Sequence, residues 1–177
     1  MEEKKVNIMK SAMTYGLMLA LALIAIHLVQ YLMDVYKPPA WVNLLTYAVI
    51  VGGIVYGTIR FRDDELGGYI SYGKALGFGV LLSLFASIVY GFYNYLLTAV
   101  IDPSYMEGVY RMLEETYLEL GMDYDQVETM METVKRFQTP LMMVFSSVLG
   151  FTFMGTIFSL ITSIFLKKEE PLFETKE

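Results

Sequence analysis

The third apolar stretch of this chain constrains its fold most strongly, because residues 75–101 contain no charged side chain. At about 1.5 Å per residue, a helix over this range is roughly 40 Å long, longer than the roughly 30 Å hydrocarbon core of a bilayer. Small residues, which let a second helix approach closely, recur at every fourth position: Ala75, Gly79, Ser83, Ser87 and Gly91. We therefore expect a membrane-spanning helix that forms the central packing surface of a small bundle.

Three more stretches have the length and composition of membrane spans, at residues 11–33, 41–59 and 140–166. The first is too long for the apolar core of a cleavable signal peptide, so we interpret it as an uncleaved span. Charged residues make up 18% of the chain, whereas soluble domains carry roughly 25%. The sequence predicts an all-α polytopic membrane protein with four transmembrane helices, which form one membrane domain over residues 1–177.

The segment between the third and fourth spans, residues 102–139, has the pattern of two amphipathic helices separated by a glycine. Apolar residues recur there at three- and four-residue steps, as on one face of a helix. Asp102 as N-cap and Pro103 as first helical residue predict the start of the first helix. Asp123 with Gln126 predicts a capping box for the second. The nine acidic and three basic side chains of this amphipathic helical hairpin account for the whole net charge of −6.

Met and Tyr side chains form a stripe along this hairpin, and two interpretations of the stripe stay open. Either the two helices bury it against each other, or it offers the adaptable contacts that Met-rich faces provide to protein partners. The residues that we expect to face a partner are Tyr110, Glu114, Tyr117, Met130 and Met131.

The distribution of Lys and Arg near the span ends predicts the orientation of the chain. One side carries nine basic residues, which belong to the loop at residues 60–74 and to the two ends of the chain, and the other side carries four. We expect the more basic side, with both termini, in the cytoplasm, and the hairpin at residues 102–139 is then extracytoplasmic. Four spans require both termini on one side, so the span count agrees with the charge.

Under this orientation, the polar side chains within the spans gather in the outer half of the bilayer. The candidate cluster consists of His27, Gln30, Tyr90 and Asn94. Further polar residues in the same half of the bilayer are Asn43, Thr46 and Tyr47 of the second span and Thr98 of the third. One interpretation is a ligand or proton site, because intramembrane polar residues often mark functional sites and His titrates near neutral pH. The other is that these side chains form interhelical hydrogen bonds that only stabilise the bundle.

Composition and motifs argue against most kinds of chemistry. The chain has no Cys and one His, which excludes a disulfide scaffold and a thiolate metal site and leaves few nucleophile–base pairs. The sequence contains no zinc-protease, nucleophile-elbow or P-loop motif. The four spans contain no charged residue, whereas ion-coupled transporters usually carry one there. We therefore expect no enzymatic activity, no cofactor, no metal and no nucleic-acid partner.

Several segments resemble one known family. They are residues 57–62, the loop 67–73 that reads Gly-Gly-Tyr-Ile-Ser-Tyr-Gly, residues 101–103, and the end of the last span at 155–163 followed by Lys167 and Lys168. Together they resemble domain-of-unknown-function family 4199, small integral membrane proteins found mainly in Bacteroidetes-type bacteria. The resemblance runs from the first span to Lys168. It implies a bacterial inner (cytoplasmic) membrane, and it carries over no activity, substrate or catalytic residue.

The concentration of charge and amphipathic surface in one segment favours a non-enzymatic scaffold or interaction protein. Such a protein presents the hairpin outside the inner membrane to a protein partner or to a second copy of the chain. The alternative is a small transporter or channel subunit that uses the polar cluster. A third hypothesis, a membrane enzyme acting on lipid, relies on Asp63, Asp64 or Asp102 as catalytic carboxylates.

Overall fold

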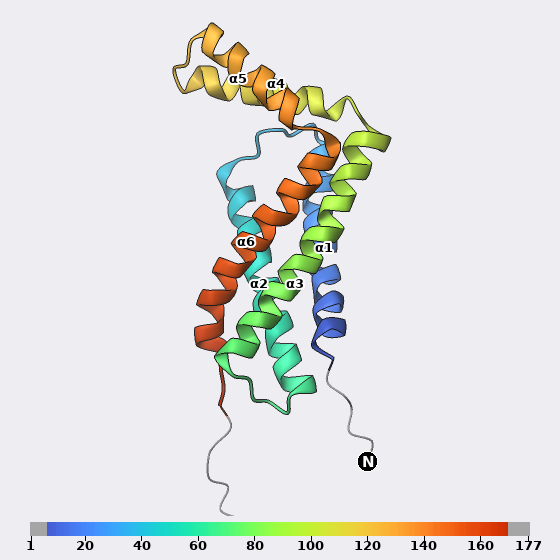
Figure 1. The fold of residues 1–177 in the computed structure, drawn as a ribbon, viewed down its shortest axis with the longest axis vertical. Helices are drawn as coiled ribbons and strands as arrows, with labels where there is room; N and C mark the ends of the chain where they lie inside the picture. The colour runs from blue at the N-terminus through green and yellow to red at the C-terminus, as the bar shows by residue number, and fades with distance from the viewer. Residues whose placement is uncertain (1–6, 170–177) are drawn as a thin grey trace, which may run out of the picture.

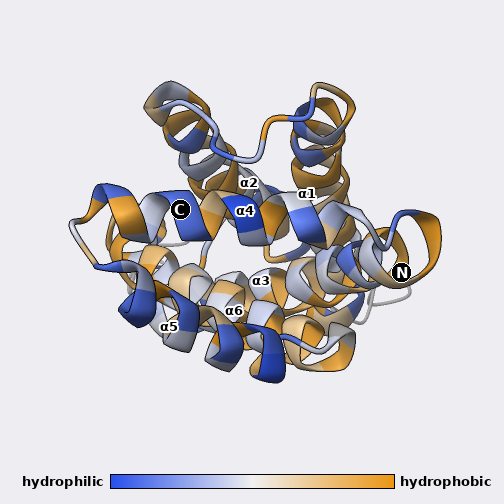
Figure 2. Cartoon of the chain, turned by 90° about the horizontal axis from the view of Figure 1, so that it is seen from above, coloured by the Kyte–Doolittle hydropathy of each residue, from blue (hydrophilic) through white to orange (hydrophobic). Residues whose placement is uncertain are grey.

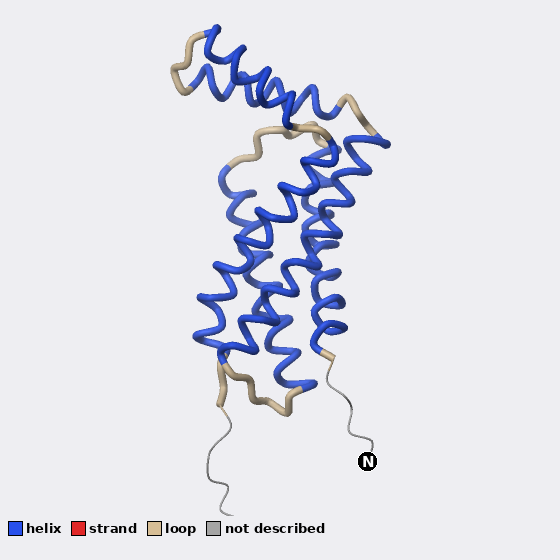
Figure 3. The backbone as a smooth tube through the Cα atoms, in the orientation of Figure 1, coloured by secondary structure: helices blue, strands red, loops and turns tan. Residues whose placement is uncertain are grey.

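In the computed structural model, which describes residues 7–169, long helices form a bundle and two shorter helices cross one of its ends (Figure 1). The bundle consists of α1 (Ile8–Leu32), α2 (Ala40–Glu65), α3 (Tyr72–Leu96) and α6 (Pro140–Leu166). The crossing pair, α4 (Tyr105–Glu119) and α5 (Tyr124–Phe137), forms the predicted hairpin. The described residues contain no strand (Figure 3), which confirms the all-α fold.

Four helical segments are long and apolar enough to cross a membrane: Ile8–Leu32, Ala40–Glu65, Tyr72–Ile101 and Leu141–Leu166. Large apolar side chains also cover the outside of the bundle. On α6, Phe145, Phe153 and Phe165 are 62%, 66% and 80% exposed. Soluble monomers rarely expose such a continuous apolar surface, so the outside of this bundle is that of a membrane protein.

Helix α3 lies at the centre of the bundle, as its ridge of small residues predicts, and packs most extensively against α6 and α1. Phe78 and Leu82 of α3 have no exposed surface. A Cβ atom on Gly16 of α1 would lie 2.8 Å from the carbonyl oxygen of Leu82, and one on Gly155 of α6 would overlap Ser83. Glycine at these two positions therefore lets both helices approach α3 closely.

The end of the bundle opposite the hairpin differs from the expectation, because helix replaces part of the loop predicted over residues 60–74. Helix α2 continues to Glu65, so the loop is confined to residues 66–71. The last turn of α2 has its own stabilising contacts. Arg60 forms an i,i+4 ion pair with Asp64 at 3.9 Å, and the Glu65 carboxylate accepts a hydrogen bond from Ser11 of α1.

The loop itself turns at Gly67 and Gly68, whose φ angles of +68° and +91° suit glycine. It then pairs with the chain beyond α6. The backbone N–H of Ile70 donates to the carbonyl of Lys168 at 2.8 Å, and the N–H of Lys168 donates back to Ile70 at 2.9 Å. Ser71 is the N-cap residue of α3, and its side chain makes no capping hydrogen bond within the described residues.

The hairpin also begins later than the Asp102-Pro103 signal predicts, because α4 starts at Tyr105. The Asp102 carboxylate instead closes a turn before the helix. Its Oδ1 accepts hydrogen bonds from the backbone N–H of Ser104 at 3.1 Å and from the Ser104 hydroxyl at 2.5 Å. At the other end of α4, Gly121 terminates the helix as predicted, with a φ of +86°.

The capping box that opens α5 is confirmed. The backbone N–H of Gln126 donates to Asp123 Oδ1 at 2.9 Å, and the Gln126 side chain accepts from the Asp123 backbone at 3.3 Å. Helices α5 and α6 are separate. Thr139 Oγ1 accepts a hydrogen bond from the Met142 backbone at 3.3 Å, and Pro140 occupies the first position of α6, where no N–H is needed.

Candidate functional site

Three of the four residues predicted as a polar cluster share one cavity near the hairpin end of the bundle. His27 and Gln30 of α1 and Tyr90 of α3 line a space of about 220 Å³ where α1, α2, α3 and α6 meet. Asn94 lies outside this lining, and its amide donates to the carbonyl of Tyr90 in its own helix at 2.8 Å. The remaining lining residues are Leu23, Ile26, Asn43, Thr46, Ile50 and Phe151.

His27 has a polar contact on only one side of its ring. Its Nε2 lies 3.1 Å from the Tyr105 hydroxyl, within hydrogen-bonding distance. Its Nδ1 is buried and has no hydrogen-bond partner among the described residues. The rings of Tyr90, Tyr93 and Tyr105 lie 5.6 to 6.0 Å from the imidazole, centroid to centroid. A buried polar atom without a partner is unfavourable, so this side of the His27 ring makes no stabilising polar contact with the described residues.

Tyr105 belongs to the hairpin, and no local sequence pattern predicts its contact with His27 of α1. Its ring packs against Tyr31 at 5.5 Å and Tyr36 at 5.3 Å. Burial, together with the neighbouring tyrosines, raises the pKa of Tyr105 to about 12, so its hydroxyl keeps its proton at neutral pH. The structure therefore joins the polar cluster to the hairpin through the contact between His27 and Tyr105.

Asp102 holds the chain in place just before the hairpin. The Tyr31 hydroxyl donates to Asp102 Oδ2 at 3.1 Å. The pKa of Asp102 lies below its usual range, chiefly because Ser104 donates hydrogen bonds to the carboxylate and secondly because Tyr31 does. Asp102 follows η1 (Leu97–Ile101), a π-helical turn that ends the third span, and its N–H donates to the carbonyl of Leu97 at 2.8 Å. The carboxylate thus has a capping role in this turn.

Two further contacts attach the hairpin to the connection between α1 and α2. Lys37 forms an ion pair with Glu119 at 2.5 Å, with both side chains more than half exposed. A Cβ atom on Gly108 would overlap the ring of Tyr36. The hairpin is therefore held to the bundle through contacts at both ends of α4, whereas α5 packs against α4 (Figure 1).

The face between α4 and α5 forms a second hollow, which we call the acidic groove. It has a volume of about 410 Å³. Val127 and Met131, which are 2% and 5% exposed, form its apolar floor, and Tyr124 at its edge is 78% exposed. The charged residues that line the groove are Glu114, Glu128, Glu132 and Lys135. Three carboxylates around an apolar floor give the groove a negative charge.

The residues predicted to face a partner are divided between packing and exposed surface. Met131 is buried between the helices, whereas Met130 is 41% exposed. Glu114 lines the acidic groove. Tyr110 and Tyr117 are half-buried. The ammonium group of Lys135 lies 5.7 Å from the centroid of the Tyr110 ring. The Met and Tyr stripe is therefore partly buried between the two helices and partly exposed, and contact of its exposed part with a partner stays a prediction.

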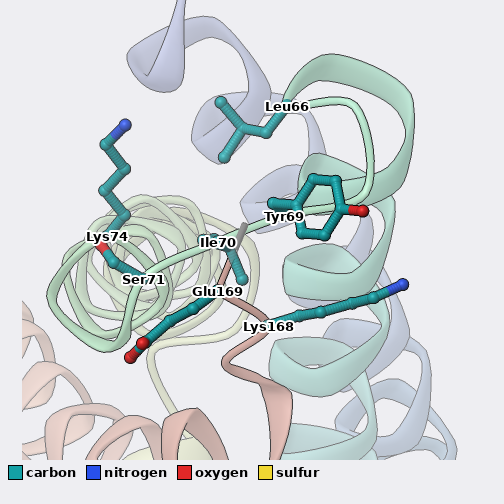
Figure 4. A pocket seen from close by; sticks show the side chains of 7 residues that line it. All are labelled: Leu66, Tyr69, Ile70, Ser71, Lys74, Lys168 and Glu169. Atoms are coloured by element: carbon teal, nitrogen blue, oxygen red, sulfur yellow. The ribbon is translucent and has the colours of Figure 1, made fainter. Parts of the chain in front are cut away.

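A third hollow, of about 300 Å³, lies at the opposite end of the bundle beside the bridge between the loop and the chain after α6. Figure 4 shows that its charged side chains, Lys74, Lys168 and Glu169, point in different directions. The ammonium of Lys168 lies 5.3 Å from the ring centroid of Tyr69. These side chains do not converge on one point, so the hollow has no focused polar site.

The carboxylates of the lipid-enzyme hypothesis do not come together either. Asp63 pairs with Arg62 at 2.7 Å on α2, and Asp64 pairs with Arg60. Asp102 lies at the opposite end of the third span, where it caps a turn. Across residues 7–169, no group of three or more His, Asp or Glu side chains is placed to hold a metal ion.

Comparison with known protein families gives a match over most of the chain. A family model described as a protein of unknown function (DUF4199) matches residues 14–168, from α1 through the hairpin to the end of α6. The match ends at Lys168, the residue that pairs with Ile70. No curated protein and no solved structure matches the chain.

Proposed function

The chain belongs to the DUF4199 family of proteins of unknown function, and we propose that it is a non-enzymatic interaction protein of the bacterial inner membrane. In this proposal both termini lie in the cytoplasm, and the α4–α5 hairpin faces outward, where its acidic groove receives a protein partner. The orientation follows from the excess of Lys and Arg on the side of the termini.

The observation that carries the proposal is the acidic groove. Its floor is apolar and its rim carries Glu114, Glu128 and Glu132. An apolar centre with a charged rim is the usual composition of a protein interface. The charge favours a partner segment that presents Lys or Arg around an apolar side chain, because complementary potentials speed encounter and exclude wrong partners.

The test is photo-crosslinking in native membranes, with a photoreactive amino acid in place of the exposed Tyr124. We expect a discrete crosslinked product whose partner segment, identified by mass spectrometry, is basic. Changing Glu114, Glu128 and Glu132 to Gln should remove the product. A matched variant that neutralises Glu107, Glu115 and Asp125, which do not line the groove, should keep it. A product that survives the groove variant would contradict the proposal.

The alternative function, a small transporter or channel subunit, has the polar cavity in its favour. Toward the opposite end of the bundle, however, the interior is closed by apolar side chains. The rings of Phe61 and Phe78 stack 4.3 Å apart and are at most 2% exposed, and Leu82 is fully buried. A polar solute leaving the cavity would meet this layer, so the geometry supports a binding site more than a pathway.

A further inference from the structure

We propose that the groove between α1 and α2 binds one membrane lipid, whose uncharged, hydroxyl-bearing headgroup occupies the polar cavity at the hairpin end. This site is separate from the acidic groove, so the lipid proposal can be tested independently of the proposed function. Helices α1 and α2 stand side by side on the side of the bundle away from α5 (Figure 2). Two hollows follow one another along this pair of helices, and they differ in polarity.

The upper hollow is the polar cavity, and its chemistry suits hydroxyl groups. The amides of Gln30 and Asn43, which line the cavity, each supply donors and an acceptor. Thr46 Oγ1 already donates to the carbonyl of Val42 at 3.0 Å, so it is left as an acceptor. A group that both donates and accepts, such as a hydroxyl, can satisfy all of these partners.

Among the residues that the structure describes, no charged side chain lines this cavity. A phosphate or an ammonium placed there would lose water without gaining an opposite charge, which is far more costly than burying a neutral group that forms hydrogen bonds. The cavity also presents the rings of Tyr90 and Phe151. Flat apolar walls with a few placed polar groups are typical of sites for small neutral ligands, and a sugar headgroup has both hydroxyl groups and an apolar C–H face.

The lower hollow is almost wholly apolar and has a volume of about 260 Å³. Leu19 packs onto Gly53 there, whereas the position of a Cβ on Gly52 is open space. The residues that line this hollow are Tyr15, Met18, Leu19, Ala22, Val49, Gly52, Gly53 and Tyr56. Such a surface fits a hydrocarbon chain and offers almost nothing to a polar ligand.

The two hollows are adjacent along α1 and α2, with the polar cavity nearer the hairpin end and the apolar hollow deeper in the bundle, which is the order of headgroup and tail in a lipid. Ala22 and Val49 line the apolar hollow, and their sequence neighbours Leu23 and Ile50 line the polar cavity. At about 1.5 Å per residue, Asn43 lies roughly 5 Å from the start of α2, near the level of lipid headgroups. A tail that fills one leaflet is about 15 Å long, half of the roughly 30 Å core, so it reaches from the cavity into the apolar hollow.

The test is native mass spectrometry of the full chain in phosphatidylcholine nanodiscs that contain a minor fraction of glucosyl diacylglycerol. We expect one glucosyl lipid to stay bound to the wild type. Asn43→Leu, which removes an amide from the cavity wall, should lower retention by about tenfold, the effect of one lost hydrogen bond to the headgroup. The matched control is Asn94→Leu, whose amide bonds only its own helix, and it should retain the lipid.

A second pair of variants tests the tail and does not depend on the polar residues. Gly52→Leu fills the open space of the apolar hollow and should displace the lipid. Gly150→Leu on α6 enters equally open space outside the hollow and should not. In the wild type, a glucosyl lipid with a diazirine on its acyl chain should label peptides of α1 and α2 rather than α6.

Several results would overturn the proposal. They are equal retention of phosphatidylcholine, no retained lipid in the wild type, and loss of the lipid in the control variants as well as the test variants. Binding of free methyl glucoside in phosphatidylcholine nanodiscs, with no preference for the glucosyl lipid, would identify a soluble ligand instead. Labelling spread evenly over all four bundle helices would show a lipid that only surrounds the protein.

Discussion

Replacing Tyr105 with Phe should loosen the hairpin from the bundle while leaving both folded. The change removes the 3.1 Å contact between the Tyr105 hydroxyl and His27 Nε2. A hydrogen bond contributes about 1 kcal/mol net, and a buried polar atom left without a partner costs about 1–3 kcal/mol. His27 Nδ1 already lacks a partner, so the variant leaves both ring nitrogens unsatisfied. We expect a loss of about 1–3 kcal/mol, or roughly 5- to 150-fold more frequent opening of α4.

Hydrogen–deuterium exchange of the protein in nanodiscs measures this opening. The amides of α4 should exchange faster by that factor, whereas those of α3 should be unchanged, because local opening and global unfolding are separate events. The control is Tyr110→Phe on the same helix, whose hydroxyl makes no hydrogen bond within residues 7–169. Unchanged protection of α4 in Tyr105→Phe, or an equal loss in Tyr110→Phe, would refute the coupling between the polar cluster and the hairpin.

Three more predictions concern the bundle, the turn and the surface. Gly155→Leu, which overlaps α3, should destabilise the bundle by about 1–3 kcal/mol in thermal denaturation in detergent, whereas Gly150→Leu in open space should not destabilise it. Because hydrogen bonds hold the pKa of Asp102 below its unfolded value of about 4, its stabilising contribution is present above pH 4 and is lost as the pH falls through the lower folded value. Asp102→Asn should remove this pH-dependent loss of stability, measured by hydrogen–deuterium exchange of the hairpin amides. The exposed pair of Lys37 and Glu119 should contribute less than about 1 kcal/mol in a double-mutant cycle, and a larger coupling energy would contradict its exposure.

The membrane-spanning helices could be predicted from the sequence because each depends on local composition. An apolar run without charges predicts a membrane helix wherever it lies, and the Gly and Ser ridge of α3 predicts close packing. Capping signals were equally local, and the capping box of Asp123 and Gln126 is present. The end of α2 was not readable, because its extension to Glu65 is stabilised by Ser11, which lies on a different helix.

The candidate site was readable only in part, for the same reason. The polar residues of α1 and α3 were recognisable because they interrupt apolar spans. Which of these side chains meet depends on how each helix is rotated about its axis. The Asn94 amide donates to the backbone carbonyl of Tyr90 in the same helix and not to another helix. Tyr105 was missed because it reaches His27 only after the chain reverses at Asp102. A contact between residues far apart in sequence leaves no periodic pattern in a single chain.

Labelling of single cysteines tests the proposed placement of the hairpin most directly, because the chain contains no Cys that would react in the background. Glu128→Cys places a thiol on α5, and Ser71→Cys places one in the loop at the opposite end of the bundle; both positions are exposed. In spheroplasts treated with a membrane-impermeant maleimide, we expect Glu128→Cys to be labelled at once and Ser71→Cys only after lysis. Labelling of Ser71→Cys in intact spheroplasts, with Glu128→Cys protected, would place the acidic hairpin in the cytoplasm and contradict the proposed function.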